Sequence, residues 1–279
     1  KMLPVAASEH GEKYDSMLNV TLVVTGIVFF FTQALLFWFA FKYQSTEKRT
    51  SFFYAHNNKL ELIWTTIPAI AMASLVAIGL KNWFTMTDEA PANSQVVEII
   101  GKQFNWIIRY PGADDVLGVR DFRKINDANN VLGQDWNDKA NMDDIIAENG
   151  EMHLIKGRPV KMIIGSRDVI HDVGLPHFRM KMDAVPGIVT TIWFTPKYTT
   201  EEMKKISGNP NFVYEISCDQ MCGKGHYSMR GTIIVETEAE HQAWLAKQKS
   251  YYATMNAPAA APADSAAQQT DSVKAITMK

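Results

Sequence analysis

The chain has 279 residues, a mass of 31.4 kDa and a formal net charge of −2 at pH 7. This length allows one or two domains. The balanced charge excludes the strongly basic surface that nucleic-acid binding requires, and two cysteines in the whole chain exclude a disulfide-based scaffold.

The first third of the chain predicts a membrane anchor. Residues 1–18 are polar and lack the regions of a signal peptide, so we interpret them as the mature end left by processing or as a trimmed end. Residues 19–41 and 62–80 carry no charged side chain. About 20 apolar residues cross the hydrocarbon core as a helix, so residues 19–88 predict a transmembrane helical hairpin that tolerates Pro68.

The loop between the two spans predicts the topology. It holds Lys42, Lys48, Arg49 and Lys59, and short loops rich in Lys and Arg stay in the cytoplasm. Both termini then face the opposite side. We therefore expect the prokaryotic inner (plasma) membrane, with the C-terminal part in the periplasm, rather than the mitochondrial inner membrane.

From residue 95 to residue 237 the pattern becomes that of short strands. Runs rich in β-branched residues, such as 95–100, 160–164, 188–194 and 231–235, alternate with turns that contain Gly or Pro. This pattern is typical of an antiparallel sandwich or barrel.

Two later segments depart from the strand pattern. Residues 112–150 hold nine acidic and four basic side chains, a balance of −5, which predicts a solvated insertion or an acidic docking surface for a basic protein. Residues 238–255 predict a short C-terminal helix, and residues 256–279, rich in Ala, Pro, Ser and Gln, predict a disordered tail.

Soft metal ligands are concentrated within a dozen residues. Cys218, Cys222, His226 and Met229 follow one another closely, and thiolate, imidazole and thioether together select copper. A blue-copper site uses one thiolate, so the second cysteine favours two bridged copper ions. A disulfide and a zinc site stay open as alternatives, although methionine argues against zinc. His171, at the end of an apolar run, offers a second imidazole.

Together these features resemble subunit II of the haem-copper cytochrome c oxidases, the subunit that carries the dinuclear CuA centre. The resemblance covers roughly residues 15 to 245. It rests on the hairpin, on the ligand-rich segment 218–229 and on four short motifs: ELIWTTIP at 61–68, GKQFNW at 101–106, DVIH at 168–171 and MDAVPG at 182–187. It implies a cupredoxin-like Greek-key β-barrel on a two-helix anchor.

The resemblance also implies the ligands of the two copper ions. They would be two bridging thiolates, one imidazole for each ion and two weak axial groups, namely Cys218 and Cys222, His171 and His226, and Met229 with the backbone carbonyl of Gln220.

The implied role is that of the subunit at which electrons enter a terminal respiratory oxidase. A c-type cytochrome, free or held in a supercomplex, would reduce the copper centre, and haem in subunit I would then reduce oxygen to water with proton pumping. Electrons would enter near Phe104 and Trp106, and Glu61 would lie at the entrance of a proton path. The implied partners are subunit I, other oxidase subunits, the donor cytochrome and membrane lipid, with no nucleic acid.

Three positions depart from the family pattern. Gln220 replaces a Glu that reaches an interfacial magnesium or manganese ion, so we expect that ion to be bound weakly, elsewhere or not at all, because hard cations favour charged oxygen ligands. Phe104 stands in place of an exposed Trp, and Ile188 in place of an Arg. These changes affect the donor contact and the interfacial cation, and they leave the copper ligands intact.

Two other functions use the same architecture. One is a copper-free structural subunit II of a quinol oxidase, which the complete set of side-chain ligands disfavours. The other is the copper-dependent electron-transfer domain of another reductase, such as nitrous-oxide reductase, which the membrane hairpin disfavours.

Overall fold

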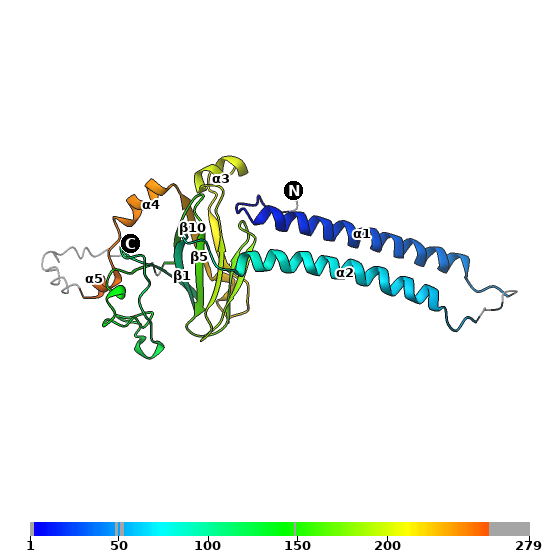
Figure 1. Cartoon of the computed structure of the whole chain (residues 1–279), viewed down its shortest axis with the longest axis horizontal. Coiled ribbons are helices and arrows are strands. Elements are labelled where there is room, and N and C mark those ends of the chain that lie inside the picture. The colour runs from blue at the N-terminus through cyan, green and yellow to red at the C-terminus, as the bar shows by residue number, and fades with distance from the viewer. Residues whose placement is uncertain (1–2, 48–49, 51–52, 148, 257–279) are drawn as a thin grey trace, which may run out of the picture.

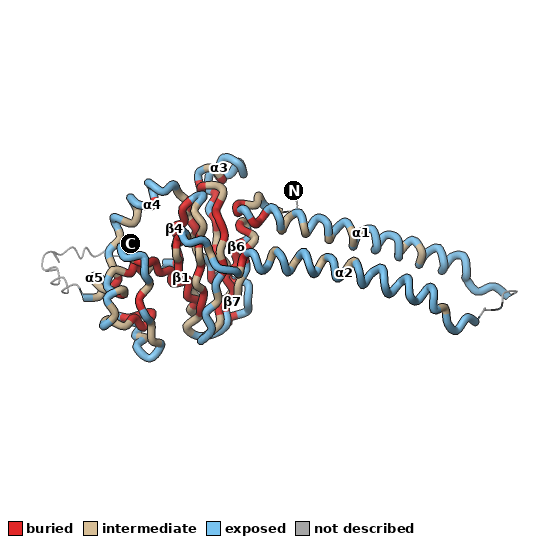
Figure 2. Tube along the Cα trace, in the orientation of Figure 1, coloured by how far each residue is buried: buried red, intermediate tan, exposed pale blue. Residues whose placement is uncertain are grey.

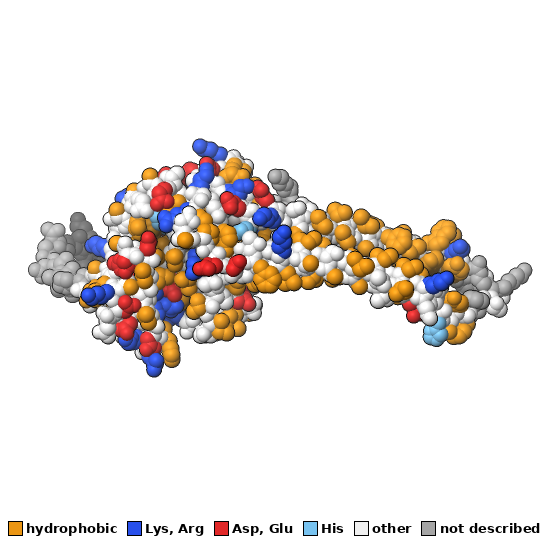
Figure 3. All heavy atoms as spheres, in the orientation of Figure 1, with side chains coloured by type: hydrophobic (Ala, Val, Ile, Leu, Met, Phe, Trp, Pro, Cys, Tyr) orange, Lys and Arg blue, Asp and Glu red, His pale blue; other side chains and the backbone are white. Residues whose placement is uncertain are grey.

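The computed structural model describes residues 3–47, 50, 53–147 and 149–256 (Figure 1). Two long helices, α1 (Gly11–Lys42) and α2 (Asn58–Thr87), run side by side away from a β-domain that contains most of the remaining chain. None of their most apolar windows is buried, and many hydrophobic side chains lie on the face that Figure 3 shows. Such a surface needs lipid or a partner subunit to cover it, so the predicted hairpin anchor is confirmed.

The segment before α1 packs on the β-domain. The helix begins at Gly11, earlier than the predicted span that starts at residue 19. Ahead of it, the Ala7 amide donates to the His177 carbonyl at 2.7 Å, and the Ser8 hydroxyl donates to the Phe178 carbonyl at 2.6 Å. The described residues of the polar N-terminal segment predicted for residues 1–18 are therefore partly helix and partly a strap on the domain.

The β-domain consists of two five-stranded sheets. Their strand orders are β3-β2-β1-β5-β8 and β4-β10-β9-β6-β7. The strands are β1 (Gln95–Lys102), β2 (Asn105–Tyr110), β3 (Ile145–Ala147), β4 (Glu151–Ile155), β5 (Val160–Ser166), β6 (His171–Leu175), β7 (Met180–Ala184), β8 (Thr190–Phe194), β9 (Tyr214–Cys218) and β10 (Arg230–Glu236). Helix α3 (Thr200–Ser207) lies between β8 and β9 in the chain.

Most strand pairs are antiparallel, but two are parallel. Strand β1 pairs with β5, and β10 pairs with β4, in parallel. The prediction of antiparallel strands is wrong for these pairs. The chain leaves the first sheet after β3 and forms β4 in the second sheet. Strand β5 then returns to the first sheet beside β1 and runs in the same direction as β1. The rest of the predicted class, two apolar helices followed by a cupredoxin-like β-sandwich, is confirmed.

The core lies between the two sheets, where alternate side chains of each strand face inward. Figure 2 shows buried segments concentrated in the β-domain, whereas the two long helices are exposed. Trp106, Phe178, Phe194 and Tyr214 are among the largest buried side chains.

The described part of the insertion predicted for residues 112–150 packs on the domain through one side, although many of its residues stay exposed to solvent. Arg109 of β2 is 1% exposed and donates to Glu98 at 2.9 Å and to Asp144 of the insertion at 3.1 Å. Leu132 is fully buried in a second hydrophobic cluster. The insertion also contains β3 and two short 3-10 helices, η1 (Phe122–Lys124) and η2 (Lys139–Asn141).

The single helix predicted for residues 238–255 is two helices, α4 (Glu238–Leu245) and α5 (Tyr251–Met255). The chain breaks between them because the Ser250 side chain accepts from the Ala253 amide and starts a new helix. Apart from Asn256, the predicted disordered tail lies outside the described residues.

Candidate metal centre

The predicted ligand residues meet at one end of the second sheet. His171 opens β6, and Cys218 closes the neighbouring strand β9. Cys222 follows in the copper loop, which we define as residues 218–229. His226 begins a 3-10 helix, η3 (His226–Ser228), and Met229 follows it.

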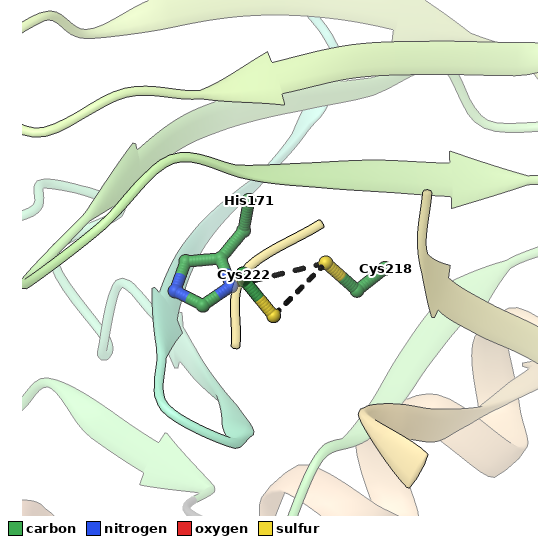
Figure 4. A group of neighbouring side chains, drawn as sticks. All are labelled: His171, Cys218 and Cys222. Atoms are coloured by element: carbon green, nitrogen blue, oxygen red, sulfur yellow. Dashed lines mark hydrogen bonds between the residues drawn. The ribbon is translucent and has the colours of Figure 1, made fainter. Parts of the chain in front are cut away.

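The side chains form two adjoining halves. The Sγ atoms of Cys218 and Cys222 are 3.7 Å apart, and both residues are free cysteines. Cys218 Sγ lies 3.8 Å from His171 Nδ1, and Figure 4 shows these three side chains pointing toward one another. Cys222 Sγ lies 3.7 Å from His226 Nδ1 and 3.9 Å from Met229 Sδ. Each thiol therefore has an imidazole of its own.

A backbone carbonyl lies beside the thiols, and the burial of the thiols affects their ionisation. The Gln220 carbonyl oxygen lies 3.2 Å from Cys218 Sγ, beside the candidate ligand side chains. Burial and the neighbouring Cys218 raise the pKa of the Cys222 thiol to about 11. Two adjacent buried thiols ionise together only when a cation balances their charge, and a coordinating metal does so. Soft sulfur and imidazole donors arranged in this way fit copper.

Asp168 fixes the tautomer of His171. Its Oδ1 lies 2.8 Å from His171 Nε2, so Nε2 carries the proton and Nδ1 is left to bind a metal. Asp168 Oδ2 accepts from the Gln103 amide at 2.7 Å. Partial burial opposes ionisation of Asp168, but the hydrogen bonds from Gln103, His171 and Val169 outweigh it and lower the pKa of this carboxyl.

The β1–β2 turn holds the copper loop in place. Gln103 Nε2 donates to the Cys222 carbonyl at 2.6 Å. The Phe104 ring packs so closely on the loop that a Cβ at Gly225 would come within 2.5 Å of it. Gly223 has a φ of 134°, a conformation that other residues rarely adopt. Both glycines are needed where the loop passes this ring.

Sequence reasoning missed Asp168 and Gln103 as positioning residues. The spacing of Asp and His in the DVIH motif would have revealed Asp168. The contact between Gln103 and Cys222 joins positions 119 residues apart, and no local pattern indicates it.

The two residues predicted to admit electrons differ in position. Trp106 is 0% exposed, and its ring centroid lies 6.1 Å from that of His171. Trp106 therefore cannot touch a partner at the surface and can act only within a route through the protein. Phe104 is partly buried against the core.

Two other predicted residues lie apart from the thiols. Glu61 sits in the first turn of α2, where its carboxylate accepts from the Asn57 amide at 3.4 Å, at the end of the hairpin farthest from the β-domain (Figure 1). The side chain of Gln220 is exposed. Oδ2 of the neighbouring Asp219 lies 3.8 Å from Lys181 Nζ.

Comparison with known proteins places this geometry in a family. Residues 1–82 match the model of the transmembrane domain of cytochrome c oxidase subunit II, and residues 95–237 match the model of its periplasmic domain. The alternative cytochrome c oxidase subunit 2 of Bradyrhizobium diazoefficiens is 37% identical over 239 residues, which cover 85% of this chain and 80% of the relative.

More distant relatives are similar along most of the chain. Cytochrome c oxidase subunit 2 of Thermostichus vulcanus is 22% identical and aligns with 87% of this chain and 77% of its own length. The solved periplasmic domain of subunit II of cytochrome oxidase of Bradyrhizobium japonicum is 24% identical, with a TM-score of 0.38, over 57% of this chain and 95% of its own. The chain therefore belongs to the family of cytochrome c oxidase subunit II, as a membrane-anchored subunit of an oxidase complex.

Proposed function

We propose that this chain is the subunit at which electrons enter a terminal respiratory oxidase. It would accept electrons from a c-type cytochrome at a dinuclear copper centre (CuA). Haem in subunit I would then receive them for the reduction of oxygen to water, coupled to proton pumping. The observation that carries the proposal is the pair of adjacent free thiols, each beside its own imidazole.

The residues that would hold the two ions are those predicted. They would be the thiols of Cys218 and Cys222, the imidazoles of His171 and His226, Met229 Sδ and the Gln220 carbonyl oxygen. Bound copper supplies reversible storage of one electron.

The protein keeps these ligands still. Asp168 orients the His171 ring, Gln103 ties the copper loop to the β1–β2 turn, and Trp106 packs beside His171. A rigid ligand set limits the geometric change between redox states, which favours transfer at low driving force.

We place the β-domain and both termini on the periplasmic side, and Glu61 at the entrance of a proton path into subunit I. From Glu61 to the end of α2 at Thr87 the helix rises by about 40 Å at ~1.5 Å per residue. This length exceeds the hydrocarbon core of about 30 Å. Glu61 and the β-domain can therefore lie on opposite faces of the membrane.

The test is metal analysis and spectroscopy of the purified oxidase complex. We expect two coppers per chain and a mixed-valence spectrum that Cys218→Ser or Cys222→Ser abolishes. Met229→Leu should keep the copper and shift the redox potential, whereas Met221→Leu, a matched change next to Cys222, should leave the potential unchanged. One zinc and no copper in well-folded protein would end the proposal, and a metal-free complex would favour the quinol-oxidase alternative.

A further inference from the structure

Two buried histidines meet under helix α4, apart from the candidate metal centre. His153 of β4 is 5% exposed, and His241 of α4 is 4% exposed. Their Nδ1 atoms lie 3.1 Å and 3.0 Å from the same oxygen, Oε1 of Glu236 at the end of β10. One carboxylate therefore joins two strands of the second sheet to the C-terminal helix, and the proposed function uses none of these three residues.

Gln95 of β1 determines which form of His241 fits. Its Oε1 accepts from the Ile155 amide at 3.2 Å, and its Nε2 donates to the His153 carbonyl at 3.1 Å. These two bonds hold the amide group with its nitrogen toward His241 Nε2, 3.3 Å away. Because an amide nitrogen only donates, His241 Nε2 must accept, and the single proton of the ring lies on Nδ1, toward Glu236. The site therefore fits a neutral His241 imidazole.

The surroundings of His241 oppose a charge on its ring more than they favour one. Burial lowers the pKa of His241, the hydrogen bond and the charge of Glu236 raise it, and the neighbouring His153 lowers it again. Glu238, at the start of α4, adds a smaller rise, and its Oε1 also lies 3.7 Å from Arg158 Nη1. On balance the pKa of His241 lies below its ordinary value of 6.5.

The two histidines differ in what an added proton would meet. His153 Nε2 lies 3.0 Å from Glu151 Oε1, so both ring nitrogens of His153 face carboxylate oxygens. A proton added to His153 would have an acceptor, whereas a proton added to His241 would face the Gln95 amide nitrogen. His241 is therefore the histidine at which acid breaks the arrangement.

The docking of α4 depends on this one turn of the helix. His241 is its one buried residue. Trp244 stacks on His153 with ring centroids 4.0 Å apart and packs edge-on against Tyr110 at 5.2 Å. The Tyr110 hydroxyl accepts from the His153 amide at 2.6 Å and stays neutral, because burial raises its pKa. Glu240, the other acid of α4, caps the start of the helix.

Helix α4 also holds α5 in place against the insertion. We call residues 238–256, which contain both helices, the C-terminal arm. The Tyr251 amide of α5 donates to the Asp144 carbonyl at 2.8 Å, and the Tyr251 hydroxyl accepts from the Val131 amide at 3.2 Å. Figure 1 shows the arm on the side of the β-domain that faces away from the two long helices. The arm therefore ties the second sheet to the insertion.

We propose that His241, Glu236 and Gln95 form an acid-sensitive latch, which holds the C-terminal arm on the β-domain at neutral pH and releases it in acid. A second proton on His241 would set an N–H against the Gln95 amide nitrogen and leave a charge in a buried site. The stability that neutral His241 gives to the docked arm is therefore full above pH 6.5 and is lost as pH falls below 6.5. We place the β-domain on the periplasmic side, so the latch would respond to protons that the proposed oxidase pumps there.

The experiment measures hydrogen exchange of the arm by mass spectrometry in the purified oxidase complex. The pH is varied from about 8 to about 5, and the rates are corrected for intrinsic exchange. Because release is linked to one proton, protection of the arm should fall by about tenfold per pH unit below 6.5, until the lowered pKa of docked His241 is reached. Strand β5 in the first sheet should keep its protection.

Two substitutions of histidine separate the latch from a general effect of acid. His241→Asn removes the titration and keeps a donor toward Glu236, because the side-chain amide of Asn can donate where Nδ1 did. Protection of the arm should then be independent of pH. His177→Asn is the matched control. Burial lowers the pKa of His177 as well, but this residue lies under the N-terminal strap, where its carbonyl accepts from the Ala7 amide. The pH dependence of the arm should be unchanged in that variant.

Gln95→Glu tests the contact that opposes the second proton. The new carboxylate would accept from protonated His241 Nε2, so the arm should be better protected at the acid end of the range than at the alkaline end. Protection of the arm that stays constant with pH in the wild type would overturn the latch, and so would the wild-type pH dependence in His241→Asn. If His241→Asn releases the arm at every pH, the Gln95→Glu variant decides, because absence of the reversal there also overturns the proposal.

Discussion

Replacing Asp168 with Asn tests how the protein prepares His171 for metal. The carboxylate accepts three hydrogen bonds, from the Gln103 amide at 2.7 Å, from the Val169 amide at 2.7 Å and from His171 Nε2 at 2.8 Å. Asn has one acceptor oxygen. If that oxygen faces His171 and Val169, the Gln103 amide loses its partner. If the amide group is turned over, two bonds are lost and His171 must move its proton to Nδ1.

Counting bonds decides between the two orientations. The first keeps two of three, so we expect it to prevail. Loss of the Gln103 bond, which is exposed so that water can take its place, should then cost about 0.5–1.5 kcal/mol, and each kcal/mol lowers the thermal midpoint of the domain by roughly 2–4 °C. His171 would donate to a neutral oxygen in place of a carboxylate, a weaker bond. We expect copper affinity to fall by about tenfold, the lower end for loss of a group that orients a ligand.

The assay is competition of the purified complex against a copper chelator, together with thermal unfolding. Asp115→Asn is the control, because Asp115 is an exposed acid of the insertion whose φ of 57° Asn accepts readily. A lower thermal midpoint with unchanged copper affinity would refute the tautomer argument and leave Asp168 as an anchor of the turn alone.

Four further changes probe other parts of the chain. Arg109→Met should destabilise the domain by about 3–5 kcal/mol, because its buried carboxylate partners lose their counter-charge, and an unchanged denaturation midpoint would contradict this. Glu61→Gln should slow oxygen turnover and preserve the copper spectrum, whereas normal turnover would leave Glu61 a helix cap. Gln220→Glu should strengthen manganese binding, seen by paramagnetic resonance, and a tight manganese signal with Gln220 as a ligand in the wild type would refute this. Burial lowers the pKa of His177 below its ordinary value of 6.5. The stability contributed by the buried neutral imidazole is therefore full at neutral pH and is lost as pH falls below 6.5. His177→Phe should make the thermal midpoint less sensitive to acid.

The anchor and the meeting of most of the candidate ligand side chains could be predicted because their signals are local. An uncharged run of residues is itself the property that places a helix in a membrane. The four candidate ligand side chains from Cys218 to Met229 lie in one loop, so their spacing already limits how far apart they can be. The boundaries of the helices were predicted less accurately. Helix α1 begins at Gly11, ahead of the uncharged run, in polar residues that lie next to the β-domain.

The rest depends on contacts between distant positions. Arg109 meets Asp144 across 35 residues, and nothing near either residue shows that a buried ion pair turns the insertion into a folded unit. The parallel pairing of β1 with β5 follows from where the chain changes sheets. The exposure of Tyr227 and the burial of Trp106 are likewise decided by packing, although both are aromatic residues close to ligands.

The N-terminal strap has a consequence for biogenesis. Ser8 bonds to Phe178, 170 residues later in the chain, and Lys197 donates to the carbonyl of Ala7. The two membrane helices lie between these partners in sequence, so the strap reaches the β-domain only after the N-terminus has been exported. A chain whose N-terminus stayed in the cytoplasm would leave these backbone groups of the domain without their partners. Translocation of the segment before α1 is therefore a step in the maturation of the β-domain, and an insertion error would be visible as a folding defect on the other side of the membrane.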